Sequence, residues 1–135
     1  MKTYMLDTDV CSYLIRGQNR SLMEKVALNH HRLCISAITR AELLYGVARR
    51  KSRRLAADVE LLLSLLPSRE WNDGAAAAYA EIRANLEERG KTIGNMDIQI
   101  AAAAKSGGCC LVTNNVAHFG LIPGLDIENW AKQEI

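Results

Sequence analysis

Short apolar runs alternate along the chain with segments of helical spacing, and this alternation restricts the possible folds more than any other feature. Runs at 4–6, 33–36 and 109–113 have the length and composition of strands, with weaker candidates at 69–71 and 125–127. Helical patterns cover 9–16, 21–29, 39–47, 55–66, 73–89 and 95–105. Strands that alternate with helices form parallel sheets covered on both faces. The sequence therefore predicts an α/β fold, a three-layer α/β/α sandwich with a central parallel sheet.

The length and composition indicate one globular domain spanning residues 1–135. Charged residues make up 24% of the chain and the net charge is +2, which permits a nucleic-acid partner without indicating one. No apolar run approaches the ~20 residues of a membrane span, and the N-terminus lacks the apolar stretch of a signal peptide. We therefore expect a cytoplasmic protein without a membrane partner.

The cysteines lack the spacing of a metal or redox motif. They are Cys11, Cys34, Cys109 and Cys110. Cysteines of cytosolic proteins are normally reduced, so we expect these to act as small core hydrophobes. A zinc site needs more soft ligands at closer spacing than the three histidines supply.

Three acids and an amide stand where a parallel sheet would bring them to one edge. Asp7 ends the first strand, Glu42 lies early in the helix after the second strand, and Asp97 lies early in the helix after Gly94. Asn115 follows the later strand, in a turn predicted at 114–115. Functional crevices of open α/β sheets lie outside the carboxyl ends of the strands. These residues are therefore candidates for a common site.

Each acid also has a purely structural interpretation. Asp7, or Thr8 beside it, fits a helix N-cap. Thr39 and Glu42 have the spacing of a capping box, and Asp97 fits an acid that complements a helix dipole. These interpretations do not require the three acids to share an edge.

Gathered carboxylates repel one another unless a proton or a cation neutralises them. Ligands that are all oxygen favour a hard cation, and Mg²⁺ typically takes one or two carboxylates with water and phosphate oxygens. Such an ion activates a water molecule and stabilises charge on a phosphodiester. The acids therefore indicate metal-assisted phosphoester chemistry.

The motifs around these residues resemble those of PIN-domain ribonucleases, and most closely the VapC toxins of bacterial toxin–antitoxin pairs. The matching segments are 5–8, 41–47, 93–102, 111–115 and 116–130, in the same order and at similar spacing. The resemblance implies a PIN fold and cleavage of RNA that depends on Mg²⁺ or Mn²⁺.

The resemblance also implies roles for single residues. Asp7 and Asp97 would hold the metal, and Glu42 would complete the acidic pocket and orient the attacking water. Asn115 stands where many members carry a fourth acid, and its amide brings no charge. The hydroxyls of Thr8 and Thr113 would position water or phosphate.

VapC toxins are typically inhibited by a VapB antitoxin whose C-terminal arm lies in a groove of the toxin. They usually form homodimers. Their substrates are structured RNAs, so the resemblance implies tRNA or ribosomal RNA, with the anticodon region of initiator tRNA as one expectation.

A basic run follows the helix that carries Glu42. Residues 49–54 hold five cations in six positions, and Arg49, Arg50 and Lys51 come first. We expect these three to contact RNA phosphates, each contact adding to a salt-dependent affinity. The alternative is a solvated helix end whose cations complement the helix dipole.

Two other functions fit part of the pattern. The residues Asp7-Thr8-Asp9-Val10 match the opening motif of haloacid-dehalogenase-type phosphatases, in which Asp7 would be a covalent nucleophile and Asp9 a general acid. That mechanism needs a late acidic motif that Thr113-Asn114-Asn115 does not supply. The second alternative is a catalytically silent module that binds RNA or protein, which the missing charge at Asn115 favours.

Overall fold

A computed structural model of the protein describes residues 1–131. Its centre is a five-stranded, entirely parallel sheet of order β3-β2-β1-β4-β5. The strands are β1 (Tyr4–Leu6), β2 (Leu33–Ser36), β3 (Ser68–Arg69), β4 (Cys110–Val112) and β5 (Ile127–Glu128). In the register of the sheet, Met5 of β1 lies between Cys34 and Leu111. The N-terminal strand is therefore the central one, and its C-terminal end lies in the middle of the sheet edge.

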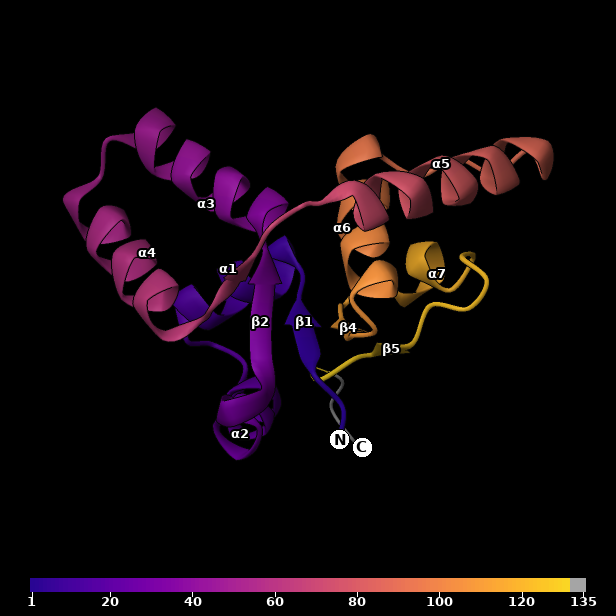
Figure 1. Ribbon diagram of the computed structural model, residues 1–135. Helices are drawn as coiled ribbons and strands as arrows, with labels where there is room; N and C mark the ends of the chain where they lie inside the picture. Colours follow the sequence, from indigo (N-terminus) through magenta and orange to yellow (C-terminus); the bar gives the residue numbers. More distant parts are fainter. Residues whose placement is uncertain (132–135) are drawn as a thin grey trace.

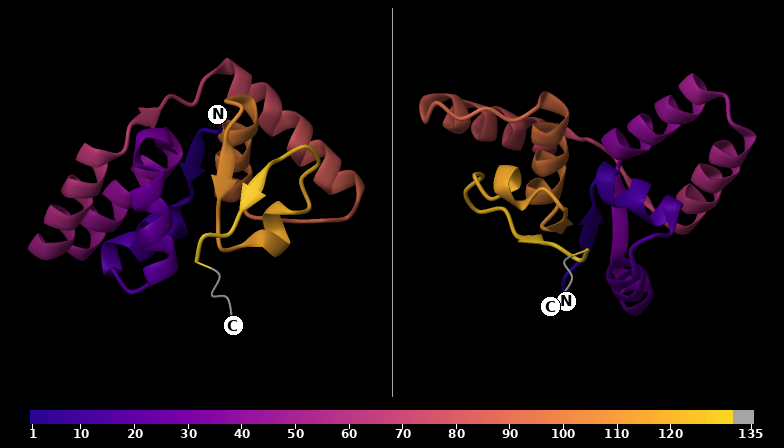
Figure 2. Two further views of the ribbon diagram at one scale, coloured as in Figure 1. Left: turned by 90° about the horizontal axis from the view of Figure 1, so that it is seen from below. Right: turned by 180° about the vertical axis from the view of Figure 1, so that it is seen from behind.

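Helices cover both faces of this sheet (Figures 1 and 2), which confirms the predicted three-layer α/β/α sandwich. The helices are α1 (Thr8–Arg16), α2 (Arg20–Leu28), α3 (Ala37–Arg50), α4 (Arg53–Leu65), α5 (Asp73–Glu88), α6 (Asn95–Ser106) and α7 (Val116–Phe119), with a 3₁₀ turn at His30–Arg32. Helices α1 to α4 lie on one side of the sheet, and α5 to α7 lie on the other.

The alternation of side chains along the strands divides the core in two. Met5 and Leu111 belong to a cluster with Ile82 of α5 and Ile100 of α6. Leu6 and its neighbours on the opposite face pack with residues from α1 to α4. Because both faces of the strands are buried, their sequences are continuous apolar runs rather than alternating ones.

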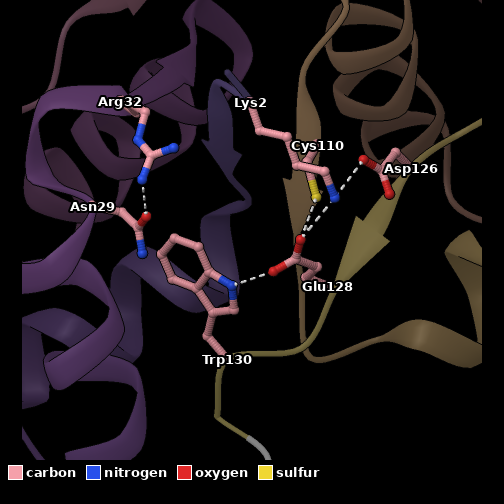
Figure 3. A network of polar contacts seen from close by, with 7 residues as sticks. All are labelled: Lys2, Asn29, Arg32, Cys110, Asp126, Glu128 and Trp130. Atoms are coloured by element: carbon pink, nitrogen blue, oxygen red, sulfur yellow. Dashed lines mark hydrogen bonds and ion pairs between the residues drawn. The ribbon is translucent and has the colours of Figure 1, made fainter.

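The C-terminal segment is attached to the start of the chain by a polar network (Figure 3). Trp130 is 1% exposed, and its indole N–H donates to Glu128 at 2.9 Å. Lys2 forms ion pairs with Glu128 at 3.1 Å and with Asp126 at 3.2 Å. The ring of Trp130 also packs against Tyr4 with a centroid separation of 4.8 Å. These contacts join residues 126–130 to the first residues of the chain.

The element boundaries differ from the prediction mainly around the third helix. Helix α3 begins at Ala37, because Ser36 caps it by accepting the backbone N–H of Ile38, and it continues to Arg50. The basic run is therefore divided between the end of α3 and the start of α4. The short β3 begins at Ser68 rather than at residue 69, and β5 lies at Ile127–Glu128 rather than at 125–127. Helix α7 was not predicted.

The cysteine prediction agrees with the structure. All four cysteines are free and buried, so they pack as small hydrophobes in the core. Among residues 1–131, no helix is both long and apolar enough to cross a bilayer.

Candidate active site

Three neighbouring strands end at the edge where the candidate residues were predicted to meet. Asp7 directly follows β1, and its backbone N–H donates to the carbonyl of Val112 at the end of β4. Thr113 follows β4, and α3, which carries Glu42, starts directly after β2. Because the strands are parallel, these positions share the C-terminal edge of the sheet.

Asp7 is a buried carboxylate that also caps α1. It is 4% exposed, and its Oδ1 accepts the backbone N–H of Val10 at 2.8 Å. Burial raises the pKa of Asp7 to about 6, although hydrogen bonds from Thr113 and Val10 act in the opposite direction. The capping role predicted as an alternative is therefore real, but it does not explain why a charged group is kept in a buried position.

Two further aspartates lie within electrostatic reach of Asp7. The negative charges of Asp9 and Asp97 both raise the pKa of Asp7. The pKa of Asp97 is itself raised by burial and by the charge of Asp9, against the opposing charge of His118. Asp97 is partly buried in the first turn of α6, and Asp9 is exposed in the first turn of α1. The edge thus gathers negative charge that costs free energy.

Glu42 reaches this edge through a hydroxyl. The Thr8 hydroxyl donates to Oε1 of Glu42 at 2.6 Å, the length of a charge-assisted hydrogen bond. Its oxygen lies 3.1 Å from the hydroxyl of Thr39, and since Thr8 has a single hydroxyl proton, Thr39 is the donor of that second bond. The capping box proposed for Thr39 and Glu42 is wrong, because Ser36 is the N-cap and Thr39 lies buried inside α3. Glu42 is held toward Thr8, next to Asp7.

The segment after β4 closes the far side of the site. The Thr113 hydroxyl donates to Asp7 and accepts the backbone N–H of Asn115 at 3.0 Å. The side-chain amide of Asn115 lies 2.8 Å from Nδ1 of His118. The buried side chain of Asn114 has no hydrogen-bond partner among the described residues, and such a polar group is more stable beside a bound water or ion.

The donors at this edge fit a hard divalent cation. They are oxygen atoms, and neither Asp7 nor Asp97 forms an ion pair with a basic side chain within residues 1–131. Burial and the charges of Asp9 and Asp97 raise the pKa of Asp7, so a positive charge at this edge would stabilise its ionised form. In the described part of the chain, no three histidine, cysteine, aspartate or glutamate side chains form a metal cage. The few carboxylates present would leave much of the shell of such a cation to water and phosphate oxygens.

The basic run does not act as one unit. Arg50 lines a groove that also contains Thr8 and Glu42. The guanidinium of Arg49 lies 3.5 Å from the hydroxyl of Tyr45 on its own helix, and Lys51 ends α3 with a left-handed backbone (φ 52°). All three side chains are exposed, so the RNA contacts predicted for them stay predictions.

Sequence reasoning missed two residues beside the acids. Asp9 was considered only as the general acid of a phosphatase, yet its charge acts on both the buried carboxylate of Asp7 and on Asp97. His118 was considered only as a zinc ligand, yet it contacts Asn115 and faces Asp97. The sequence could have indicated both residues by their spacing. Asp9 lies two residues after Asp7, His118 lies three residues after Asn115, and each lies in the helix that starts there.

Comparison with known proteins identifies a family and close relatives. The family model described as "PIN domain" matches residues 4–119. The tRNA(fMet)-specific endonuclease VapC of Salmonella typhimurium is 39% identical over 96% of this chain and 99% of its own length. Ribonuclease VapC2 of Haemophilus influenzae is 38% identical over the same shares of the two chains.

Solved structures agree with these relatives. A chain of the VapBC2 complex from Rickettsia felis, bound to a DNA fragment from its promoter, superposes with a TM-score of 0.89 at 36% identity, covering 95% of this chain and 98% of that one. A chain of DNA-bound VapBC from Salmonella typhimurium gives 0.88 at 40% identity, with coverage of 96% and 99%. The phosphatase alternative is wrong, because neither the matching family nor these relatives are phosphatases.

Proposed function

The chain belongs to the PIN-domain family of VapC ribonucleases, and on this basis we propose that it is the toxin of a toxin–antitoxin pair and cleaves structured RNA. The observation that carries the proposal is the edge of the sheet where the charges of Asp9 and Asp97 raise the pKa of the buried Asp7, and where no described basic side chain forms an ion pair with Asp7 or Asp97. Such a group of acids destabilises the fold unless a proton or a bound cation offsets the repulsion. Unneutralised acids at a sheet edge are what a metal-dependent nuclease needs.

Asp7 and Asp97 would hold the ion, which we propose to be Mg²⁺, with Mn²⁺ as a substitute. When bound, it supplies Lewis-acid stabilisation of the phosphate and a water of lowered pKa. Glu42, oriented by the hydroxyl of Thr8, accepts a proton from the attacking water and fixes its direction. Thr113 keeps Asp7 in place by donating a hydrogen bond to it.

Asn115 contributes an uncharged amide at the fourth position of the site. Because it brings no negative charge, the residues support one firmly held ion better than two. The contact of Asn115 with His118 keeps its amide at the start of α7, beside the histidine whose charge acts on Asp97.

The substrate we propose is tRNA, with the anticodon region of initiator tRNA as the specific target. The relative from Salmonella typhimurium is named a tRNA(fMet)-specific endonuclease, and it aligns over nearly the whole of both chains. Cutting an initiator tRNA would stop translation, which explains why such a protein needs an inhibitor. The reaction belongs in the cytoplasm, where tRNA is found.

The partners follow from the same relationship. The similar solved chains come from VapBC complexes, so we propose a VapB-type antitoxin that inhibits this protein. We also propose that the protein forms a homodimer and that residues 1–135 form a single PIN domain.

The test is cleavage of purified total tRNA in Mg²⁺ by the wild-type chain, by Asp97→Asn and by Asp126→Asn. Asp126 is the matched control, because it is a surface aspartate paired with Lys2 and not part of the site. We expect wild type and Asp126→Asn to cut one tRNA at a defined position, which sequencing of RNA ends identifies, and Asp97→Asn to leave it intact. Equal survival of tRNA with all three proteins would instead support the silent binding module.

A further inference from the structure

A groove beside the candidate active site has no role in the chemistry described so far. It lies between α1, α3 and α4, has a volume of about 210 Å³, and shares Thr8 and Glu42 with the site. This volume is below the ~300–1,000 Å³ of pockets that hold drug-sized ligands, so it suits one nucleoside rather than a folded element. Because Thr8 and Glu42 belong to both places, a ligand in this groove lies next to a ligand bound at the acids.

The walls of the groove combine positive charge with an apolar surface. Arg16 comes from the last turn of α1 and Arg50 from the last turn of α3, and both line the groove. Within residues 1–131, neither guanidinium forms an ion pair with a carboxylate. The guanidinium of Arg16 lies over the ring of Tyr13, 4.8 Å from its centroid, which restricts its position. Ile15 and Val59 supply apolar wall.

We propose that this groove binds the nucleotide next to the scissile phosphate of the RNA. The apolar wall receives the face of the base, and Arg16 and Arg50 bind the phosphates on either side of it. Guanidinium groups match the geometry of phosphate oxygens, and packing a base against apolar side chains removes its face from water. The inference rests on the proposed function, because the identity of the occupant follows from the acids that share the groove.

The residues of the basic run at 49–54 differ in their position relative to this groove. Arg50 lines the groove, whereas the guanidinium of Arg49 lies beside Tyr45 of its own helix. Arg16 is 34 positions away from Arg50 in the sequence, and no basic cluster marks it. The RNA contacts therefore come from the ends of two helices and not from one continuous stretch.

The first experiment measures binding of end-labelled total tRNA in EDTA, with every protein carrying Asp97→Asn so that nothing is cut. Arg16→Gln and Arg50→Gln are compared with Arg83→Gln, which removes the same charge from α5, where Arg83 pairs with Glu87. We expect each groove variant to raise Kd roughly tenfold, as for loss of a hydrogen bond to a charged group. The slope of log K against log salt should also fall by about 0.7 for each lost phosphate contact.

The second experiment fills the groove without changing its charge. Gly46 of α3 lines the groove, and a Cβ atom added there meets no atom within 4 Å. Gly46→Leu should therefore extend into the groove, and leucine is a better helix former than glycine, so α3 is not weakened. We expect roughly tenfold weaker tRNA binding with an unchanged salt slope, and a much smaller change for Gly46→Ala. Thermal unfolding checks that all variants are folded.

Unchanged tRNA affinity in the Arg16, Arg50 and Gly46→Leu variants would overturn the proposal. The same holds if these variants weaken binding of the antitoxin alone, since the groove would then be a protein-docking surface. Failure of the proposed function appears differently, as wild-type protein that does not cleave tRNA in Mg²⁺.

Discussion

Replacing the buried carboxylate at the end of β1 should stabilise the metal-free protein. The pKa of Asp7 is raised to about 6 from an ordinary value of 3.8, mainly by burial. At about 1.4 kcal/mol for each pH unit between these values, ionised Asp7 costs the fold about 3 kcal/mol at pH 8. Asn at this position removes the charge and still caps the helix, because Asn and Asp are equally good N-caps. Losing the hydrogen bond from Thr113 offsets about 1 kcal/mol of this.

The net gain for Asp7→Asn at pH 8 in EDTA is therefore about 2 kcal/mol, or about 8 °C in Tm for a domain of this size. This gain in stability depends on pH. The folded chain binds the Asp7 proton more tightly than the unfolded chain, so wild-type stability falls as pH rises from about 4 to about 6 and then levels off. The advantage of the variant should consequently disappear near pH 4.5.

The assay is thermal unfolding followed by circular dichroism, at pH 4.5 and at pH 8, with EDTA or with Mg²⁺. Added Mg²⁺ should raise the Tm of wild type by mass action and leave the Tm of Asp7→Asn almost unchanged, which narrows the difference in Tm between the two proteins. The reasoning is refuted if the variant is no more stable than wild type at pH 8 in EDTA, or if its advantage is the same at both pH values.

Three further changes test other parts of the structure. Thr8→Val removes the hydroxyl that orients Glu42. We expect tRNA cleavage in Mg²⁺ to slow about tenfold or more, while the Tm stays within a few degrees of that of wild type. An unchanged cleavage rate would show that the contact between Thr8 and Glu42 is not needed. Trp130→Ala should lower the free energy of unfolding in urea by about 3–5 kcal/mol, because the ring is fully buried, and a loss below 1 kcal/mol would contradict the packing. Burial acts to raise the pKa of Glu128, but hydrogen bonds from Trp130 and Lys2 outweigh it and hold the pKa below its ordinary value. Ionised Glu128 therefore stabilises the fold at pH values above the ordinary glutamate pKa, and this stabilisation is lost as the pH falls through the lowered pKa of Glu128. In a plot of Tm against pH, Glu128→Gln should therefore show a smaller fall in Tm at acidic pH than wild type.

Much of the site could be predicted because strand ends are local signals. Asp7 ends an apolar run, and Glu42 and Asp97 lie early in helices, so a parallel sheet brings all three toward one edge without knowledge of any tertiary contact. The fold class followed from the same alternation of short runs and helices.

The remaining features depend on contacts between distant segments. The start of α3 was placed too late because Ser36, which ends β2, also caps the helix. The bond between Thr8 and Glu42 spans 34 positions, and the approach of His118 to Asp97 joins two separate helices. Arg16 lines the groove with Arg50 only because the C-terminal ends of α1 and α3 lie next to each other. No periodicity or composition encodes these approaches.

The central claim is that Asp7 and Asp97 together hold a divalent ion at the C-terminal edge of the sheet. Binding of Mn²⁺, followed by the loss of the free-ion signal in electron paramagnetic resonance, tests this directly and does not depend on the RNA substrate. Wild type and Asp126→Asn should bind the ion equally well, and Asp97→Asn should bind it at least about tenfold more weakly. If Asp97→Asn binds Mn²⁺ as tightly as wild type, the ion is not held by these acids.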